Sequence, residues 1–240
     1  YLANLKIKDE DLLYGLALGI FRAGQSRMFN DSLNETMINL IGPGHQERVR
    51  EMASHHLARF GRLAKGLDQR EADLIQAAAS DQHPYVRMNC IRALSNIQSP
   101  LAQATLVNSI KNDENYLVRI NALRTYRASY DSVRTLILET LNDENEHVAI
   151  TASQYLLRNA TVADVDTLLQ LAQKSPYWLV KSNLLSVAYK FSDDNKVGDY
   201  IKATYNKSKN IYEQSYLLTA LATQLKDYGW IAEKLYNSDN

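Results

Sequence analysis

The sequence predicts an all-α fold, a right-handed α–α superhelix of about seven helix pairs. The main observation is a segment that recurs: residues 81–94 (DQHPYVRMNCIRAL) return in residues 113–126 (DENYLVRINALRTY). Both copies carry an aspartate six residues before an arginine, then Val-Arg-x-Asn, an apolar pair and a second arginine. Glycine and proline are scarce, at 9 and 4 of 240 residues, which disfavours a β fold with many tight turns.

Apolar residues at positions i, i+4 and i+8 predict seven helices, because this spacing places three side chains on one helix face. Aligned on the valine of the repeat, the triplets are Leu12/Leu16/Ile20, Val49/Ala53/Leu57, Val86/Cys90/Leu94, Val118/Ala122/Tyr126, Val148/Ala152/Leu156, Val180/Leu184/Ala188 and Glu213/Leu217/Leu221. Their first residues lie 30 to 37 positions apart, a period typical of α-solenoids. The last triplet departs from the pattern, since Glu213 replaces an aliphatic residue.

Each triplet is expected to lie on the second helix of a pair. The first helices are predicted at residues 33–41, 70–79, 101–111, 132–142, 162–173, 196–205 and 229–236. Start signals support this division: capping-box patterns at Ser32/Glu35 and Asp68/Glu71, and a cap before a proline at Ser99-Pro100, His83-Pro84 and Ser175-Pro176.

The sequence offers no domain boundary, and each helix pair is expected to bury its apolar face only against its neighbours. We therefore expect one repeat domain over residues 1–240. The chain starts with Tyr1 instead of methionine, so we expect a fragment of a longer protein. Its 27 basic and 27 acidic residues cancel, which argues against nucleic acid as a partner. No apolar run of 18 residues is present to span a membrane.

The pattern of residues 81–94 and 113–126 resembles the HEAT repeat of the HEAT/armadillo superfamily, and the likeness covers nearly the whole chain. In HEAT proteins this aspartate and arginine link successive repeats. The resemblance therefore implies structural roles for Asp81, Arg87, Asp113 and Arg119. The match is partial further on: Ala149 replaces one arginine, Ser175 one aspartate and Lys181 another arginine. A local change in the stacking or curvature is expected at Ala149.

A narrower resemblance concerns residues 11–21 (DLLYGLALGIF), 49–60 (VREMASHHLARF) and 86–97 (VRMNCIRALSNI). They are similar to the helical-repeat region that accompanies a cyclophilin-type peptidyl-prolyl isomerase domain in some bacterial proteins. This implies an accessory region and favours the bacterial cell envelope, although the sequence itself leaves the compartment open. The cyclophilin motifs are absent, so no isomerase residue is carried over and the chain itself is predicted not to be an enzyme.

No catalytic, cofactor or metal site is predicted. His55 and His56 are adjacent, so on a helix they point about 100° apart, and neither has a histidine or cysteine at i+4; with His45 they are taken as part of a mildly basic helix face. Glu146-His147 lacks the order and the second copy that HEAT-like metal hydroxylases require. Cys90 takes a position held by alanine in other repeats, which predicts a buried, inert thiol.

The alternative function is that of HEAT-like DNA glycosylases, which are about this size and use a basic concave face. The basic stretches at residues 48–70 and 196–209 are interrupted by acidic residues, which disfavours this alternative.

Two groups of residues are candidates for binding. Asn89, Asn121 and Asn183 occupy one repeat position and could form an interhelix ladder or present amides to a bound peptide backbone. Eight of the 15 tyrosines and both tryptophans lie in residues 177–240, where they could fill the core or form a recognition surface.

The sequence therefore predicts a non-catalytic scaffold that binds a protein, a peptide or another domain of its own chain. The candidate contacts are Tyr177, Trp178, Tyr212 and Tyr216, together with Asn183, for which a structural role is the alternative.

Overall fold

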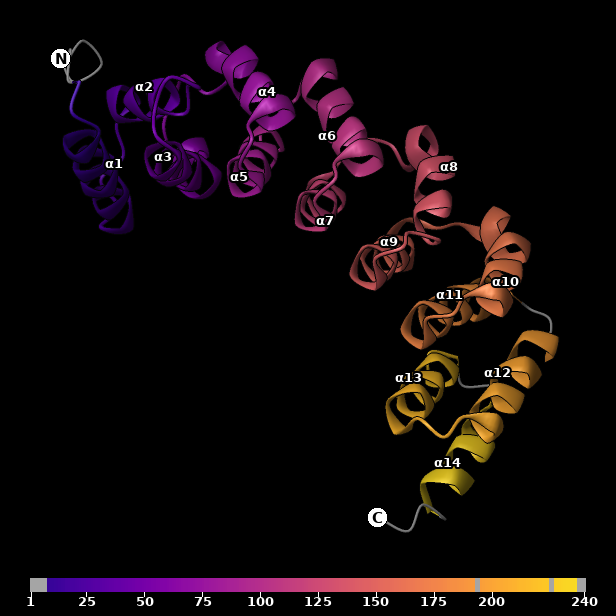
Figure 1. Ribbon diagram of the computed structural model, residues 1–240. Helices are drawn as coiled ribbons and strands as arrows, with labels where there is room; N and C mark the ends of the chain where they lie inside the picture. Colours follow the sequence, from indigo (N-terminus) through magenta and orange to yellow (C-terminus); the bar gives the residue numbers. More distant parts are fainter. Residues whose placement is uncertain (1–7, 193–194, 225–226, 237–240) are drawn as a thin grey trace. The chain divides into compact units, whose positions relative to one another are not determined.

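The computed structural model describes residues 8–192, 195–224 and 227–236. In these ranges the chain forms 14 α-helices, joined in places by short 3₁₀ turns (Figure 1). It divides into two compact units, residues 1–128 and residues 129–240. We describe each unit by itself, and the expectation of one domain over the full chain stays a prediction.

Unit 1 contains seven helices in two layers (Figure 1). They are α1 (Glu10–Gln25), α2 (Asp31–Leu40), α3 (Glu47–Phe60), α4 (Glu71–Ser80), α5 (Pro84–Leu94), α6 (Pro100–Asn112) and α7 (Tyr116–Thr125). The second helices α1, α3, α5 and α7 pack in series, and α2, α4 and α6 each cover the second helix that follows them in the chain.

Unit 2 repeats this arrangement with helices α8 to α14 (Figure 1). They are α8 (Tyr130–Thr140), α9 (Glu146–Asn159), α10 (Val165–Lys174), α11 (Trp178–Phe191), α12 (Asn195–Lys207), α13 (Ile211–Ala222) and α14 (Tyr228–Tyr236). Helix α11 contacts both α9 and α13, and α14 packs on α13. The described residues thus form six complete helix pairs, preceded by α1 and followed by α14. In the described part of the chain, no helix is both long enough and apolar enough to cross a membrane.

The predicted triplets form the core of the second-helix layer. From Val49/Ala53/Leu57 onward, every apolar member of the six triplets is buried, and even Glu213 is only 9% exposed. In the first triplet Ile20 is buried as predicted, but Leu12 and Leu16 are wrong by one residue. Leu12 is 63% exposed, and the buried face of α1 carries Leu13, Ala17 and Ile20.

Two neighbouring leucines, Leu12 and Leu13, made the register of α1 ambiguous, since either could begin an i, i+4 series. Gly24 extends the observed face by one more turn. A Cβ atom at Gly24 would lie 2.7 Å from Cδ2 of the Phe60 ring, so this residue lets α1 and α3 approach closely.

Several helix starts differ from the predicted caps. The predicted cap Ser99 accepts a hydrogen bond from the backbone N–H of Ala102 at 3.0 Å. Helix α2, however, is capped by Asn30 instead of Ser32, because the Asn30 side chain accepts from the Ser32 N–H. Asp68 begins a 3₁₀ turn (Asp68–Arg70) that precedes α4.

Helix α11 also starts later than predicted, at Trp178. Ser175 does not cap it. The Oγ atom of Ser175 instead accepts from the backbone N–H of Tyr177 at 3.3 Å and shapes the turn before the helix.

Candidate functional site

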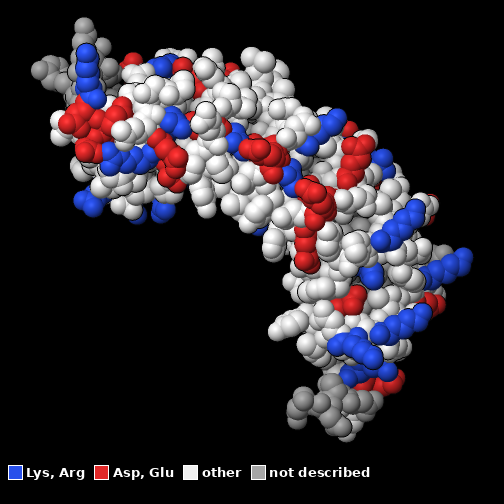
Figure 2. Space-filling model, in the orientation of Figure 1, with Lys and Arg blue, Asp and Glu red and all other residues white. Residues whose placement is uncertain are grey.

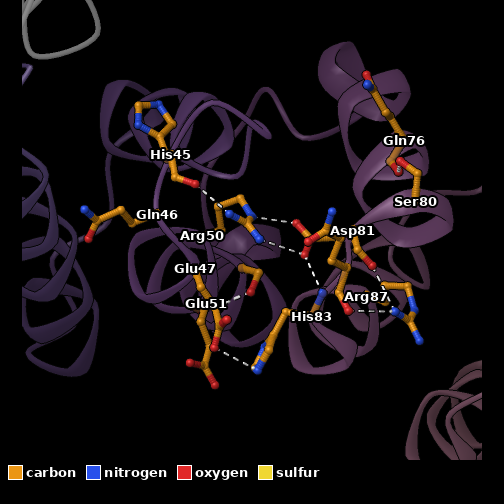
Figure 3. Close-up of polar contacts among 12 residues, drawn as sticks. His45, Gln46, Glu47, Arg50, Glu51, Gln76, Ser80, Asp81, His83 and Arg87 are labelled. Carbon is orange, nitrogen blue, oxygen red and sulfur yellow. Dashed lines mark hydrogen bonds and ion pairs between the residues drawn. The ribbon is translucent and has the colours of Figure 1, made fainter.

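Buried arginine–aspartate pairs join successive repeats of unit 1, and Figure 3 shows one of them, Arg50–Asp81. Arg50 on α3 donates from Nε and Nη2 to the two carboxylate oxygens of Asp81, at 2.7 and 3.1 Å. Arg87 on α5 makes the same bidentate pair with Asp113, with both distances at 2.9 Å. The Asp81 and Asp113 side chains are only 4% and 8% exposed, so water screens these charges little.

Each aspartate also shapes the turn before its own helix. The Oδ1 atom of Asp81 accepts from the His83 N–H at 2.8 Å, and that of Asp113 accepts from the Asn115 N–H at 2.9 Å. The repeat arginines bond back to this turn as well: Arg87 and Arg119 donate to the carbonyl oxygens of Asp81 and Asp113, each at 2.9 Å. The hydrogen bond to Asp113 raises the pKa of Arg87 further above its usual value.

Arg50 is a linking residue that the sequence reasoning missed, because it was grouped with a basic stretch. The signal was present, since Arg50 directly follows the repeat valine Val49 just as Arg87 follows Val86.

Within unit 2, the first of these turns keeps its aspartate, Asp143, whose Oδ1 accepts from the Asn145 N–H at 2.9 Å, whereas the next two turns have serine instead. Ser175 and Ser208 take the position of the aspartate, and each Oγ accepts from the backbone N–H two residues later, at 3.3 and 3.1 Å. Ala149 and Lys181 take the position of the arginine. In each case both members of the expected pair, Ala149 with Ser175 and Lys181 with Ser208, have changed together.

The three repeated asparagines do not form a chain of amide contacts with one another. Asn89 donates to Oγ of Ser54 at 3.2 Å, and Asn183 donates to Oγ of Ser153 at 2.9 Å. Both serines lie one repeat earlier, at the fifth position after the repeat valine, a regularity that the sequence alignment contained. Asn121 has no serine at that place and donates to the Leu117 carbonyl of its own helix at 2.8 Å.

Asn183 is only 4% exposed. Its burial and its bond to Ser153 favour the structural alternative for this residue, so we leave it out of the binding surface proposed below.

The predicted aromatic residues come together at the beginnings of α11 and α13. The rings of Trp178 and Tyr216 meet edge to face with centroids 5.6 Å apart. Tyr212 lies one turn before Tyr216 on α13, and these two tyrosines are 69% and 47% exposed. We call Trp178, Tyr212 and Tyr216 the aromatic patch.

Tyr177, the fourth predicted aromatic contact, does not belong to the aromatic patch. It is half-buried, and its hydroxyl donates to the Glu144 carbonyl oxygen at 3.2 Å, so it links α11 to the turn before α9.

A groove of about 500 Å³ runs over α1, α3 and α5 in unit 1, and the sequence reasoning did not identify it. Its lining residues are Tyr14, Arg48, Glu51, Met52, His55, Tyr85, Met88, Asn89 and Arg92. Most of them occupy equivalent repeat positions on neighbouring helices, such as Arg48 with Tyr85 and His55 with Arg92. The repeat alignment could therefore have placed them on one face.

The three histidines considered for a metal make separate contacts. His45 approaches Glu10 at 3.1 Å, whereas His55 packs on Phe21 and His56 on Phe60. Burial, with a smaller effect of His55, lowers the pKa of His56 to about 4, so this buried ring is neutral at pH 7.

Glu47, Glu51 and His83 do bring ligand atoms within 4.8 Å of one another (Figure 3). Nε2 of His83 contacts Glu47 Oε1 at 3.0 Å, whereas its Nδ1 is buried without a hydrogen-bond partner. A metal on Nε2 would force the ring proton onto Nδ1, where it would have no acceptor. We therefore assign no metal to this cluster.

Cys90 is fully buried, as its packing position predicted. Burial raises the pKa of its thiol well above the usual range, which keeps the thiol protonated and unreactive.

On the face that Figure 2 presents, acidic side chains gather near the middle of the view and basic side chains predominate toward its lower end, with wide uncharged stretches between them. This distribution agrees with the zero net charge of the chain.

Comparisons with known proteins agree with this architecture. A family model of HEAT repeats matches residues 35–127 and residues 105–188. The chain is also similar in structure to an archaeal HEAT-like repeats protein from Thermococcus onnurineus NA1, with a TM-score of 0.54 and 17% identity over 90% of this chain and 97% of that one. At this identity the likeness concerns the fold alone. Among curated proteins, no sequence matches this chain.

Proposed function

Because the chain belongs to the HEAT repeat proteins, we propose that it is a non-catalytic scaffold that binds another protein through the exposed faces of its second helices. HEAT repeats typically mediate protein interactions, and a stack of helix pairs offers a long surface with few deep pockets. The partner is a protein, a peptide or another domain of the parent chain.

The single observation that carries this proposal is the aromatic patch of unit 2. Tyr212 exposes 69% of its surface, and Tyr216 stays 47% exposed although it packs against Trp178. Ile211, next to Tyr212, is also 69% exposed. Aromatic side chains of this kind supply much of the binding energy at protein interfaces, because they bury a large area at a small cost in conformational entropy.

The experiment is a selection from a random peptide library displayed on phage, with the purified chain as bait. Peptides that are selected are then synthesised and titrated by calorimetry. Replacing Trp178 and Tyr212 together by alanine is expected to weaken these peptides by about tenfold or more, since loss of one hot-spot residue costs at least ~1.4 kcal/mol.

A matched control uses two other exposed tyrosines of unit 2, Tyr228 and Tyr236, which are 68% and 91% exposed on α14. Their double replacement by alanine should leave the affinity unchanged. Circular dichroism of both variants establishes that they remain folded. Equal affinities of the wild type and the Trp178→Ala/Tyr212→Ala variant would refute the role of the patch.

Two finer predictions remain open to experiment. The accessory role beside a cyclophilin-type isomerase stays a prediction drawn from residues 11–21, 49–60 and 86–97, and it has no support from the comparisons.

The alternative function, binding of nucleic acid, also stays untested. A duplex-DNA titration at two salt concentrations would reveal it, because phosphate contacts make the affinity fall steeply with salt.

A further inference from the structure

The groove of unit 1 is lined by both apolar and polar side chains. Met52 and Met88 line it from α3 and α5, and Tyr14 and Tyr85 line it from α1 and α5. Tyr85 is 46% exposed, whereas both methionines are half-buried. Methionine side chains are flexible and adapt to ligands of different shapes. The walls therefore suit an apolar side chain of a bound molecule.

Asn89 is a buried polar group of this groove with an unused acceptor. It is only 3% exposed, and its Oδ1 atom has no hydrogen-bond partner. The orientation of its amide is fixed by Ser54. Since Ser54 Oγ donates its one proton to the Glu51 carbonyl at 2.9 Å, it can only accept from Asn89 Nδ2. Oδ1 is thus left without a donor, a costly state for a buried group.

The basic residues around the groove are only partly neutralised. Arg48 forms an ion pair with Asp11, and its guanidinium lies over the Tyr14 ring. Arg92 has no ion pair among the described residues, although it lines the groove. Glu51 is the one carboxylate among the lining residues, and its oxygens lie near Glu47 and His83.

The charges that act on His55 are also mainly positive. Burial lowers the pKa of His55, and the nearby charges of Arg92 and Arg59 lower it further, against the smaller opposing effect of Glu51. At pH 7 this ring is neutral, so Arg92 stays the available cation for a bound acidic group.

From these contacts we propose that the groove binds an extended, acidic segment of another protein. An apolar side chain of the segment lies between Met52 and Met88, and a main-chain N–H donates to Asn89 Oδ1. A neighbouring aspartate or glutamate of the segment pairs with Arg92. Because Asn89 Oδ1 is buried, this hydrogen bond requires neighbouring side chains to move. This inference rests on the proposed role as a protein-binding scaffold but concerns a surface separate from the aromatic patch.

The test uses three fluorescein-labelled peptide mixtures. The first contains hexapeptides with alternating acidic (Asp or Glu) and apolar (Leu, Met or Phe) residues. The second replaces the acidic residues by lysine, and the third replaces the apolar residues by serine. Fluorescence anisotropy is measured against the full chain. The acidic–apolar mixture should bind, whereas the other two should bind at least about tenfold more weakly, because each lacks one of the two interactions.

Arg92→Gln and Arg124→Gln form a matched pair of variants. Arg124 holds the same repeat position on α7, is exposed and does not line the groove. Arg92→Gln should weaken the acidic–apolar mixture by about tenfold through loss of a charge-assisted hydrogen bond, and Arg124→Gln should leave it unchanged. Met88→Ser should weaken the same mixture while the chain stays folded by circular dichroism.

Three results would overturn the inference: no binding of the acidic–apolar mixture, equal binding of the lysine mixture, or equal losses in the two arginine variants. The Trp178→Ala/Tyr212→Ala variant separates this inference from the proposed function. It should bind the acidic–apolar mixture as the wild type does, so a failure of the aromatic patch and a failure of the groove give different patterns.

Discussion

The two units stack the same helix pairs but hold them together in different ways. In unit 1, Arg50–Asp81 and Arg87–Asp113 connect successive repeats through buried bidentate pairs. In unit 2 the equivalent positions hold Ala149 with Ser175 and Lys181 with Ser208. There the contacts between repeats include the Trp178–Tyr216 ring contact, whereas the Asn183–Ser153 hydrogen bond has an equivalent in unit 1, Asn89–Ser54.

This difference separates two tasks of one repeat position. The aspartate both shapes a turn and links two repeats, and serine keeps only the first task. Where serine replaces the aspartate in unit 2, the arginine of the preceding repeat is replaced too, by Ala149 or by the half-buried Lys181. This is expected if an aspartate buried without its arginine is costly. The stack therefore tolerates the loss of the pair but should not tolerate half of it.

The largest effect is expected from breaking one pair of unit 1. Arg87→Met keeps much of the side-chain volume but leaves Asp113, 8% exposed, without its cation. The free energy of unfolding should fall by about 3 kcal/mol, the cost of an uncompensated buried charge. Lys181→Met, at the same position in unit 2, should change it by less than about 0.5 kcal/mol. Urea unfolding followed by circular dichroism measures both, and similar losses would contradict the comparison.

Imitating unit 2 within unit 1 should undo much of this loss. The double variant Arg87→Met/Asp113→Ser removes both charges and keeps an Oγ acceptor for the Asn115 N–H. It should be more stable than Arg87→Met alone by about 1–3 kcal/mol, because no unpaired charge remains. A double-mutant cycle completed with Asp113→Ser yields the coupling. Additive losses would show that the pairing does not link the repeats.

A smaller difference is expected between two asparagines of the same repeat position. Asn183→Ala removes a buried hydrogen bond between repeats and should cost about 1–3 kcal/mol. Asn121→Ala removes a bond within α7 and should cost less than about 1 kcal/mol, because water replaces that contact at a half-buried site. Thermal unfolding of the two variants ranks them, and the reverse order would contradict the assigned contacts.

Acid should affect the two units in different pH ranges. The pKa of His56 in unit 1 is lowered to about 4 from 6.5. A histidine that the fold keeps neutral contributes fully to the free energy of unfolding above pH 6.5, and this contribution falls as the pH drops toward 4.

In unit 2, burial alone would raise the pKa of Asp164. Hydrogen bonds from the backbone N–H of Thr161 and from Arg134 outweigh burial and hold the pKa below its usual 3.8. The contribution of Asp164 to the free energy of unfolding is therefore lost only as the pH falls below 3.8.

Hydrogen exchange of the backbone amides at a series of pH values tests this order. Protection in α3 should decline between pH 6.5 and 4, before protection in α10 does. The variant His56→Leu should flatten the early decline in α3. A decline that begins in α10 would contradict the assignment.

The sequence predicted the fold more completely than the candidate site. Repeat spacing predicted the second helices because the valine triplets must be buried whichever partner is bound, and six of the seven triplets lie where expected. The α1 register failed where Leu12 and Leu13 offered two equal patterns, and the close contact between Gly24 and Phe60 that accompanies the observed register is a tertiary feature.

The surfaces depended on contacts between helices that spacing alone does not give. Tyrosine enrichment pointed to Trp178, Tyr212 and Tyr216, but the same reasoning included Tyr177, whose hydroxyl is bonded within the fold. The groove of unit 1 was missed because its residues differ in type from one helix to the next. Only their shared repeat positions connect them.

The most direct test of the account is the hydrogen-exchange footprint of a library-selected peptide on the full chain. We predict that the peptide increases protection at the beginnings of α11 and α13, around Trp178 and Tyr212, and that the Trp178→Ala/Tyr212→Ala variant loses this footprint. A footprint confined to the first-helix layer, or one that survives the double replacement, would contradict the claim that this chain binds its partner through the exposed faces of its second helices.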